Sequence, residues 1–369
     1  MEEREFWIVL NAISGMAAGH KLRLINEYGS AQEIFRSKNR VVSRPECRPL
    51  FIQNLQTHTP EEILAREEKK ALSLGVKIIT PFDPEYPALL KEIYDPPLAL
   101  YVKGPLGSDA DRKLSIVGSR RASYYGQLVT ERITQGLLAY GFCIVSGLAR
   151  GIDSIAHRCA LEGGGKTAAV LGSGLDIVYP PENKSLFERI AACGSVMSEF
   201  PFGTEPHKMN FPIRNRIISG LSPAILIVEA REKSGALITA GCALDQGREV
   251  LAIPGNIYSP NSRGTNQLIK QGARLVEGVE DILEELGFCP KNQAGAPSSS
   301  TSPASSRPFK VKLNEKEGKI FALLSYDPMP IDVIIQMSGF GPQDIHNILL
   351  TLEMKGIIKQ LPGKLFFKV

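Results

Sequence analysis

Residues 114–120 have the sequence Leu114-Ser115-Ile116-Val117-Gly118-Ser119-Arg120, in which a short apolar run ends in glycine, serine and arginine. A short apolar run of this kind is typical of a strand that is covered on both faces of a parallel sheet. Glycine lets the backbone approach a ligand closely, and the free N–H groups at the start of a following helix attract anions. The stretch therefore predicts a central strand followed by an anion-binding loop.

Similar apolar runs alternate with segments of helical periodicity from about residue 73 to residue 288. This alternation is the pattern of an α/β domain, and it predicts an extended, Rossmann-like, doubly wound and mostly parallel sheet. We expect its strands at Lys77–Thr80, Leu98–Val102, Leu114–Val117, Cys143–Val145, Thr167–Leu171, Ser195–Ser198, Ala224–Val228 and Val250–Ile253.

The two flanks of this domain have different patterns. Residues 1–72 carry apolar side chains at helical spacing and predict a small helical domain. Residues 289–309 are rich in Ala, Pro and Ser and predict a flexible linker. Residues 310–369 predict a winged helix, with helices and then strands at Lys316–Leu324, Ile331–Met337, Gln343–Lys355, Ile357–Gln360 and Leu365–Val369.

The third of these helices would be the recognition helix of a winged helix. The third helix carries no Arg or Lys before Lys355. A helix that reads duplex DNA normally needs several cations. We therefore expect the C-terminal module to contact protein or to play an auxiliary role.

The composition excludes some classes of protein. The 369 residues carry a formal net charge of +4 and 43% hydrophobic residues, which indicates a globular, mildly basic chain. A nucleic-acid site would have to be local. The acidic Met1–Glu5 is unlike a signal peptide, no apolar run approaches bilayer length, and the scattered cysteines lack the paired spacing of zinc ligands. We expect a cytoplasmic protein with reduced thiols and no metal.

Glycine and serine occur together after three successive predicted strands. The segments are Gly118-Ser119-Arg120, Ser146-Gly147 with Arg150 downstream, and Gly172-Ser173-Gly174. Because the carboxyl ends of parallel strands lie at one edge of the sheet, these loops together predict an anion site. The alternative is that each loop only makes a tight turn. Residues 234–239, after the predicted strand Ala224–Val228, and residues 254–256, after Val250–Ile253, either extend the same edge or cap helices.

Two further segments add candidate ligand contacts. Asn183 is expected at the start of a helix, and Lys184 and Phe187, three residues apart, would share one face of it. There the ammonium would meet phosphate and the ring would stack on a base. The alternative is that Phe187 is a core residue and Lys184 a solvated charge. Arg214, Asn215 and Arg216 are expected just before a helix, as phosphate and base contacts or as a charge pair at the helix end.

Catalytic patterns are scarce. Gly172-Ser173-Gly174 lacks the third glycine of a dinucleotide fingerprint, and Gly165-Lys166-Thr167 lacks the first glycine of a P-loop. His157, four residues after Asp153, is expected to make a helix-surface contact rather than a catalytic pair. We therefore expect a protein that is not an enzyme and has no cofactor.

The ordered motifs resemble one family. Segments 116–120, 146–153, 198–201, 211–218, 234–240 and 253–257 are similar to those of the DNA-processing protein DprA, or Smf, family, over roughly Ile78–Leu286. The resemblance implies an extended Rossmann domain that binds single-stranded DNA and dimerises. It also implies that the protein protects incoming DNA in natural transformation and loads the RecA recombinase. The resemblance also implies that the DNA strand is bound by Arg120, Lys184, Phe187 and Asn215. The flanks resemble a sterile-alpha-motif-like domain and a winged helix.

Two other functions stay open on the sequence. A nucleotide hydrolase of the phosphoribohydrolase type has a similar Rossmann domain, but its Pro-Gly-Gly-x-Gly-Thr-x-x-Glu loop is not matched at Pro254-Gly255-Asn256. A partner-docking platform would use the anion loops only to stabilise the fold. A preference for single-stranded over duplex DNA would distinguish a single-stranded-DNA-binding protein from this platform.

Overall fold

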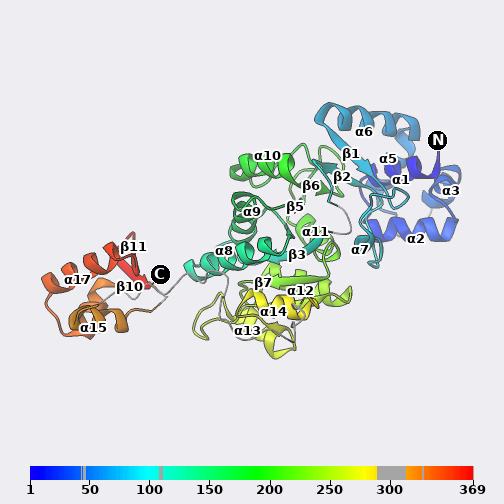
Figure 1. The fold of residues 1–369 in the computed structure, drawn as a ribbon. Helices are drawn as coiled ribbons and strands as arrows, with labels where there is room; N and C mark the ends of the chain where they lie inside the picture. Colours follow the sequence, from blue (N-terminus) through cyan, green and yellow to red (C-terminus); the bar gives the residue numbers. More distant parts are fainter. Residues whose placement is uncertain (43, 45–46, 108–110, 289–312, 326–327, 369) are drawn as a thin grey trace, which may run out of the picture. The chain divides into compact units, whose positions relative to one another are not determined.

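The computed structural model describes residues 1–42, 44, 47–107, 111–288, 313–325 and 328–368 (Figure 1). The chain divides into two compact units, Met1–Cys289 and Pro290–Val369. Among the described residues, the larger unit has three buried hydrophobic clusters and the smaller unit has one. The expected linker at 289–309 lies outside the described residues.

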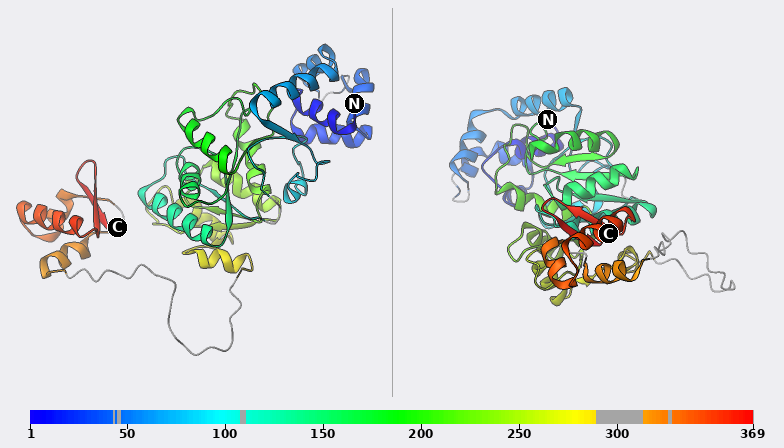
Figure 2. Two further views of the ribbon diagram at one scale, coloured as in Figure 1. Left: turned by 45° about the horizontal axis from the view of Figure 1, so that its top comes forward. Right: turned by 90° about the vertical axis from the view of Figure 1, so that its left-hand side faces the viewer.

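The larger unit begins with short helices, as the periodicity predicts. These are α1 (Glu3–Ala12), α2 (Ala18–Tyr28), α3 (Ala31–Arg36), α4 (Lys38–Val42), α5 (Pro49–Thr57) and α6 (Pro60–Leu74). Thr59 caps α6 in a capping box with Glu62, and Gly75 ends the helix in the left-handed conformation. The helices lie beside the strands at one edge of the sheet (Figure 2), and Leu64 belongs to the same buried cluster as Val196 of the sheet. The helices and the sheet therefore pack as one unit, and a boundary at residue 72 stays a prediction.

The sheet has nine strands. They are β1 (Val76–Ile79), β2 (Leu100–Lys103), β3 (Arg112–Val117), β4 (Phe142–Ser146), β5 (Thr167–Val170), β6 (Ser195–Ser198), β7 (Ala224–Ile227), β8 (Glu249–Ala252) and β9 (Arg274–Leu275). Each of the expected strands is confirmed to within two residues at either end. The two-residue β9 was not predicted, because both its residues are exposed and it carries no apolar run.

The strand order is β1-β2-β6-β5-β4-β3-β7-β8-β9. Strands β3 to β9 pair in parallel, and β2 joins β6 antiparallel. From β3 the chain proceeds through β4, β5 and β6 toward one edge, then returns to place β7 on the other side of β3. Because the strand order reverses between β3 and β7, this is the topological switch point where open α/β sheets bind ligands.

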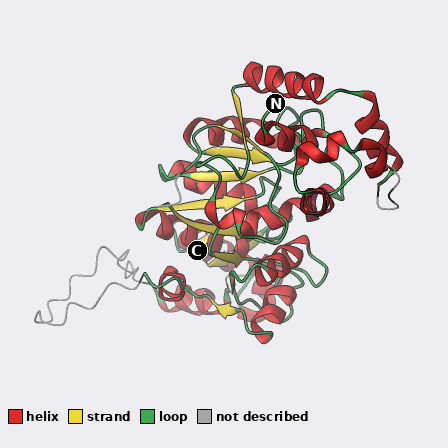
Figure 3. Cartoon of the chain, turned by 90° about the vertical axis from the view of Figure 1, so that its right-hand side faces the viewer, coloured by secondary structure: helices red, strands yellow, loops and turns green. Residues whose placement is uncertain are grey.

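Helices cover both faces of the sheet (Figure 3). Leu114 and Ile116 of β3 belong to a buried cluster with α8 and α9, whereas Val117 belongs to the cluster on the α11 and α12 side. The alternation follows the two-residue period of a strand. The helices that follow β1 in the larger unit are α7 (Ala88–Lys91), α8 (Tyr124–Ala139), α9 (Ile152–Glu162), α10 (Lys184–Cys193), α11 (Asn210–Gly220), α12 (Gly235–Asp245), α13 (Arg263–Lys270) and α14 (Val279–Glu285), with a 3₁₀ turn at Pro181–Asn183.

The expected position of one helix start is wrong. Arg214, Asn215 and Arg216 do not precede a helix but lie inside α11, which begins at Asn210. Pro212 falls in the first turn, where its missing N–H has no intrahelical partner to lose. The three side chains therefore have helical spacing and point in different directions.

The smaller unit has the expected three helices and terminal hairpin. Its elements are α15 (Glu315–Leu323), β10 (Met329–Pro330), α16 (Ile331–Ser338), α17 (Pro342–Met354), β11 (Ile358–Leu361) and β12 (Leu365–Lys368). The strands pair in the order β10-β12-β11 around buried Ile345, Leu349 and Phe366. The two-residue β10 was not predicted, because it forms only by pairing with β12.

Candidate nucleic-acid interface

A cavity of about 670 Å³ opens at the switch point, between the carboxyl ends of β3 and β7. Its lining residues come from three segments, 117–121 at the end of β3, 206–218 before and within α11, and 231–239 between β7 and the first turns of α12, together with Ala149, Asp153 and Tyr179. We call this cavity the crevice. Loops that are far apart in sequence meet there because the carboxyl ends of parallel strands all lie at the same end of the sheet.

The crevice is strongly cationic. Among the described side chains that line it, six are cationic and one, Asp153, is acidic; the cations are Arg120, Arg121, Lys208, Arg214, Arg231 and Lys233. Cations gathered in a concave site with low-dielectric walls raise the local concentration of anions. The crevice therefore favours a polyanion.

The loop after β3 presents Arg120. A Cβ at Gly118 would lie 2.7 Å from Ile152, so only glycine lets β3 pass this close to α9. The Ser119 hydroxyl receives the Arg121 N–H at 3.1 Å and donates to the Arg121 carbonyl at 3.0 Å, which fixes the turn. Arg120 is exposed, and its guanidinium lies 5.1 Å from the centre of the Phe211 ring.

Phe211 and Tyr179 place two aromatic rings beside Arg120. Their centroids are 5.6 Å apart, and both side chains are partly exposed. Partly exposed rings next to cations are the usual surface on which unpaired bases stack. The pairing of these rings was not predictable from the sequence, because one follows β5 and the other begins α11, and no local pattern connects them.

The loop after β4 has mainly internal partners. Ser146 is buried and donates to the Ile116 carbonyl at 2.6 Å. The Gly147 N–H donates to Asp153 at 3.2 Å, and the Gly147 carbonyl accepts from Arg214 at 2.7 Å. Arg150 is exposed and is paired with Glu182. Of this loop, Arg150 is therefore the cation that solvent reaches.

The segment at the start of α10 is divided between surface and core. Asn183 is buried and donates to the Leu148 carbonyl and to Ser154, both at 2.8 Å. Lys184 is exposed, but it does not line the crevice. Phe187 is 5% exposed and belongs to the buried cluster shared with the N-terminal helices. The core alternative for Phe187 is confirmed, and the expected shared face of Lys184 and Phe187 is wrong.

The three α11 residues point in different directions. Arg214 is buried and donates to the carbonyls of Gly147 and Val170, while its Nε has no hydrogen-bond partner among the described groups. Arg216 pairs with Glu199 through two hydrogen bonds of 2.7 Å and with Asp95 at 2.9 Å, which is the charge-pair alternative. Asn215 lines the crevice and donates to the Gly235 carbonyl at 3.3 Å.

Asp153 and Arg214 form the charged base of the crevice. Burial raises the pKa of Asp153, and the Arg214 guanidinium opposes that shift. Burial lowers the pKa of Arg214 to about 10, so Arg214 stays protonated at neutral pH. One oxygen of the Asp153 carboxylate accepts the Gly147 and Ala149 N–H groups, which holds the loop after β4 in place.

His157 also differs from expectation. It is fully buried in α9, and its Nδ1 lies 2.7 Å from the Thr167 hydroxyl. The expected helix-surface contact is therefore wrong, because α9 packs this face against the start of β5.

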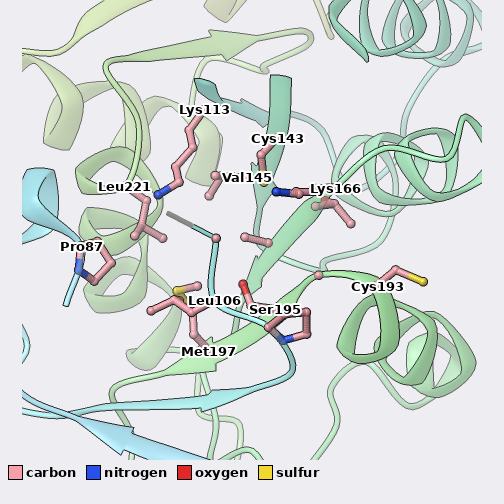
Figure 4. A pocket seen from close by; sticks show the side chains of 15 residues that line it. Pro87, Leu106, Lys113, Cys143, Val145, Lys166, Cys193, Ser195, Met197 and Leu221 are labelled. Atoms are coloured by element: carbon pink, nitrogen blue, oxygen red, sulfur yellow. The ribbon is translucent and has the colours of Figure 1, made fainter. Parts of the chain in front are cut away.

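A smaller cavity of about 180 Å³ lies near the amino ends of the parallel strands (Figure 4). Lys113 and Lys166 reach it from near the starts of β3 and β5, and most of its other lining residues are apolar. Asp111 already engages the Lys166 ammonium at 3.2 Å. Ligands of open α/β sheets bind at the carboxyl ends of the strands, so we place the candidate interface in the crevice.

Three further features of the described residues concern metal ligands, cysteine thiols and membrane-spanning helices. In the ranges that the structure covers, no group of three or more His, Cys, Asp and Glu side chains could hold a metal ion. Cys143, Cys159, Cys193 and Cys242 are free thiols, the Cys47 thiol donates to the Val41 carbonyl at 3.3 Å, and Cys289 lies outside the described residues. No helix of the described segments has both the length and the apolar character needed to cross a bilayer.

Two family models match the chain. The model described as DNA recombination-mediator protein A matches residues 77–287, and the model described as DprA winged helix domain matches residues 300–364. The first covers the sheet and the crevice, and the second covers the smaller unit.

Whole-chain relatives and solved structures agree with these matches. Protein Smf of Synechocystis is 33% identical over 98% of this chain and 98% of its own length. DNA processing protein DprA of Bacillus subtilis is 44% identical over 58% of this chain and 72% of its own. The structure of DNA processing protein A from Streptococcus pneumoniae is 36% identical and covers 77% of this chain and 98% of its own, with a TM-score of 0.67. That from Helicobacter pylori, described for its single-stranded DNA binding mode, is 29% identical and covers 57% and 95%, with a TM-score of 0.52.

Proposed function

The chain belongs to the DprA/Smf family of DNA recombination mediators, and from this premise we propose that it binds single-stranded DNA in the crevice. The observation that carries the proposal is the gathering of six cationic side chains at the switch point, beside the partly exposed rings of Tyr179 and Phe211. Cations along a groove hold a phosphate backbone, and aromatic rings receive unpaired bases of any sequence.

The predicted site residues have two roles in this proposal. Exposed groups and groups that line the crevice contact the strand: Gly118, Ser119, Arg120, Arg150, Lys184 and Asn215. Buried groups hold the loops in position: Ser146, Gly147, Asn183, Phe187, Arg214 and Arg216. Phe211 takes the stacking role that the sequence suggested for Phe187, since Phe211 lines the crevice and Phe187 is in the core.

The proposed role is that of a mediator that performs no chemistry of its own and needs no cofactor. The crevice carboxylate, Asp153, is bonded to two backbone N–H groups. We propose that the protein acts in the cytoplasm as a homodimer, protects incoming single strands in natural transformation, and loads RecA onto them. The family's description as a recombination mediator supports this role.

We propose a protein-contact or auxiliary role for the winged helix. On α17, the exposed residues include Leu350 and Met354, and the helix carries no Arg or Lys before its C-cap at Lys355. Apolar side chains in place of cations suit a protein surface better than a duplex groove.

The test compares binding of fluorescent oligo-dT and of a duplex at matched salt. Arg120→Ala and Lys233→Glu are each expected to weaken oligo-dT binding about tenfold, on the order of 1.4 kcal/mol, because each removes an exposed cation that lines the crevice. The slope of log affinity against log salt should fall in magnitude by about 0.7 for one lost contact.

Matched controls separate site effects from net charge. Arg132→Ala removes an exposed arginine from α8, and Lys270→Glu reverses an exposed lysine at the end of α13, neither of which lines the crevice. Both controls should bind like the parent. Equal affinities for all four variants, or a preference for duplex, would contradict the proposal.

A further inference from the structure

The loop after β8, residues 254–262, exposes two large apolar side chains in succession. Ile257 is 74% exposed and Tyr258 is 84% exposed. Single exposed apolar residues are common, but an isoleucine and a tyrosine side by side on one loop tip are unusual on a surface that meets only water. We call residues 254–262 the β8 loop.

The β8 loop is held firmly despite its exposed tip. The Tyr125 hydroxyl donates to the Pro254 carbonyl at 2.8 Å, and Asn266 bonds both the N–H and the carbonyl of Gly255 at 3.2 and 2.9 Å. The Tyr258 N–H donates to the Asn256 side chain at 2.9 Å. Such anchors reduce the ordering cost when a ligand binds.

Asn261 connects this loop to both walls of the crevice. Its amide donates to the Arg121 carbonyl at 3.2 Å, and its side-chain oxygen accepts from Arg231 Nε at 2.9 Å. Its backbone carbonyl accepts the Ala230 N–H at 2.8 Å. Arg121 and Arg231 line the crevice, so the loop is continuous with its cationic rim.

The order of the strands sets the direction of this continuation. β8 pairs in parallel with β7, so its carboxyl end is the next along the same edge of the sheet. A single strand of DNA that leaves the crevice between Arg121 and Arg231 meets the β8 loop next. Arg263, at the start of α13, adds a cation there, partly offset by Glu232 at 3.2 Å.

We infer that bound single-stranded DNA continues from the crevice onto the β8 loop, where Tyr258 is a second stacking platform for a base. The inference rests on the proposed function and deepens it, because it gives the strand a path and adds a contact. Arg121, Arg231 and Arg263 beside the loop favour a polynucleotide over an apolar protein partner at this position.

The test measures affinity for oligo-dT of increasing length with the full chain. Tyr258→Ala should leave affinity for the shortest bound oligonucleotides unchanged and lower affinity for long ones about tenfold, since one stacked base is lost. The length at which affinity stops rising should be shorter than in the parent. Tyr258→Phe should retain the parent's affinity, and Tyr140→Ala, an exposed tyrosine at the opposite edge, should have no effect.

Fluorescence gives a second readout. In a Trp7→Phe, Tyr258→Trp variant the one tryptophan of the chain lies on the β8 loop, and long oligo-dT should quench it more than short oligo-dT does. If Arg120→Ala binds oligo-dT more weakly than the parent does, while Tyr258→Ala matches the parent at every length, the inference fails and the proposed function stands. If the parent does not bind at all, the proposed function fails. A Tyr258→Ala variant that changes only self-association would overturn the stacking role.

Discussion

Arg214 organises the crevice at the scale of single residues. Its guanidinium donates to the carbonyls at the ends of β4 and β5, at 2.7 and 2.6 Å, and interacts with the Asp153 carboxylate. A Cβ at Gly147 would lie 2.7 Å from the guanidinium carbon, so only glycine leaves room for this arginine. A buried charge of this kind is stable because it is paired and hydrogen-bonded. Arg214 therefore positions loops and supplies positive potential from below.

His157 predicts a pH dependence of stability. The Thr167 hydroxyl donates its proton to the Ile144 carbonyl, so it accepts from Nδ1–H of a neutral His157. Burial lowers the pKa of His157 to about 3, and the charges of Arg214 and Arg158 act in the same direction. The unfolded chain binds this proton near pH 6.5. Stability from the neutral imidazole is therefore complete above pH 6.5 and is lost as pH falls toward 3.

The expected loss is about 1 kcal/mol per pH unit below pH 6. His157→Asn keeps a donor for Thr167 and removes the titration, so the free energy of unfolding of the parent should fall more steeply between pH 5.5 and 4.5 than that of the variant. Urea unfolding at the two pH values measures this difference. Parallel pH curves for the two proteins would contradict the burial of a neutral histidine.

Contacts between elements place the loop that carries Arg120. Gly151, before α9, has φ of 74° and ψ of −129°. A Cβ there would lie 2.8 Å from the carbonyl carbon of Arg120 and closer still to the Ser119 carbonyl oxygen. The amino end of α9 can therefore pack against the β3 loop only through glycine.

Gly151→Ala is expected to destabilise the protein by about 1–3 kcal/mol and to weaken oligo-dT binding, because it strains the backbone and displaces Arg120. Gly164→Ala is the matched control, since Gly164 has φ of 70° with no atom within 4 Å of the added Cβ. It should share the loss of stability from backbone strain but bind oligo-dT like the parent. Thermal unfolding measures the loss of stability, and binding titrations measure the affinity for oligo-dT. Equal affinities of the two variants would show that Gly151 does not position the DNA-binding site.

The whole molecule consists of two separately packed units. Ile334, Leu352 and Phe366 belong to the buried cluster of the smaller unit. In contrast, the N-terminal helices share a buried cluster with Val76 and Val196 of the sheet. The units should therefore respond differently to truncation.

A chain ending at residue 288 should keep the unfolding midpoint of the larger unit and the oligo-dT affinity of the parent to within about twofold, because the crevice lies wholly in that unit. A chain beginning at residue 75 should unfold or aggregate, since it loses half of a shared core. Calorimetry and the same binding assay test both. Loss of binding on removal of the winged helix would assign it part of the site.

The strands and the loops that follow them were predictable from the amino-acid sequence alone. Apolar runs such as 114–117 and 224–228 are local signals, and the order of α and β segments requires their carboxyl ends to share an edge. That edge contains Gly118, Ser119 and Arg120 of the candidate site. The short β9 and β10 have no such signal, because each exists only through pairing with a neighbour.

Only the tertiary structure decided which side chains face the crevice. A helix turns its residues by about 100° per position, so the inner and outer faces of α10 and α11 depend on the partners against which they pack. Those partners put Phe187 in the core and Phe211 beside Arg120, and they commit Arg216 to Glu199. They also bring Arg231 and Lys233 to the same cavity as Arg120. The sequence determined the edge of the sheet where the site would lie, because strand ends are local, whereas the side chains that complete it depended on long-range packing.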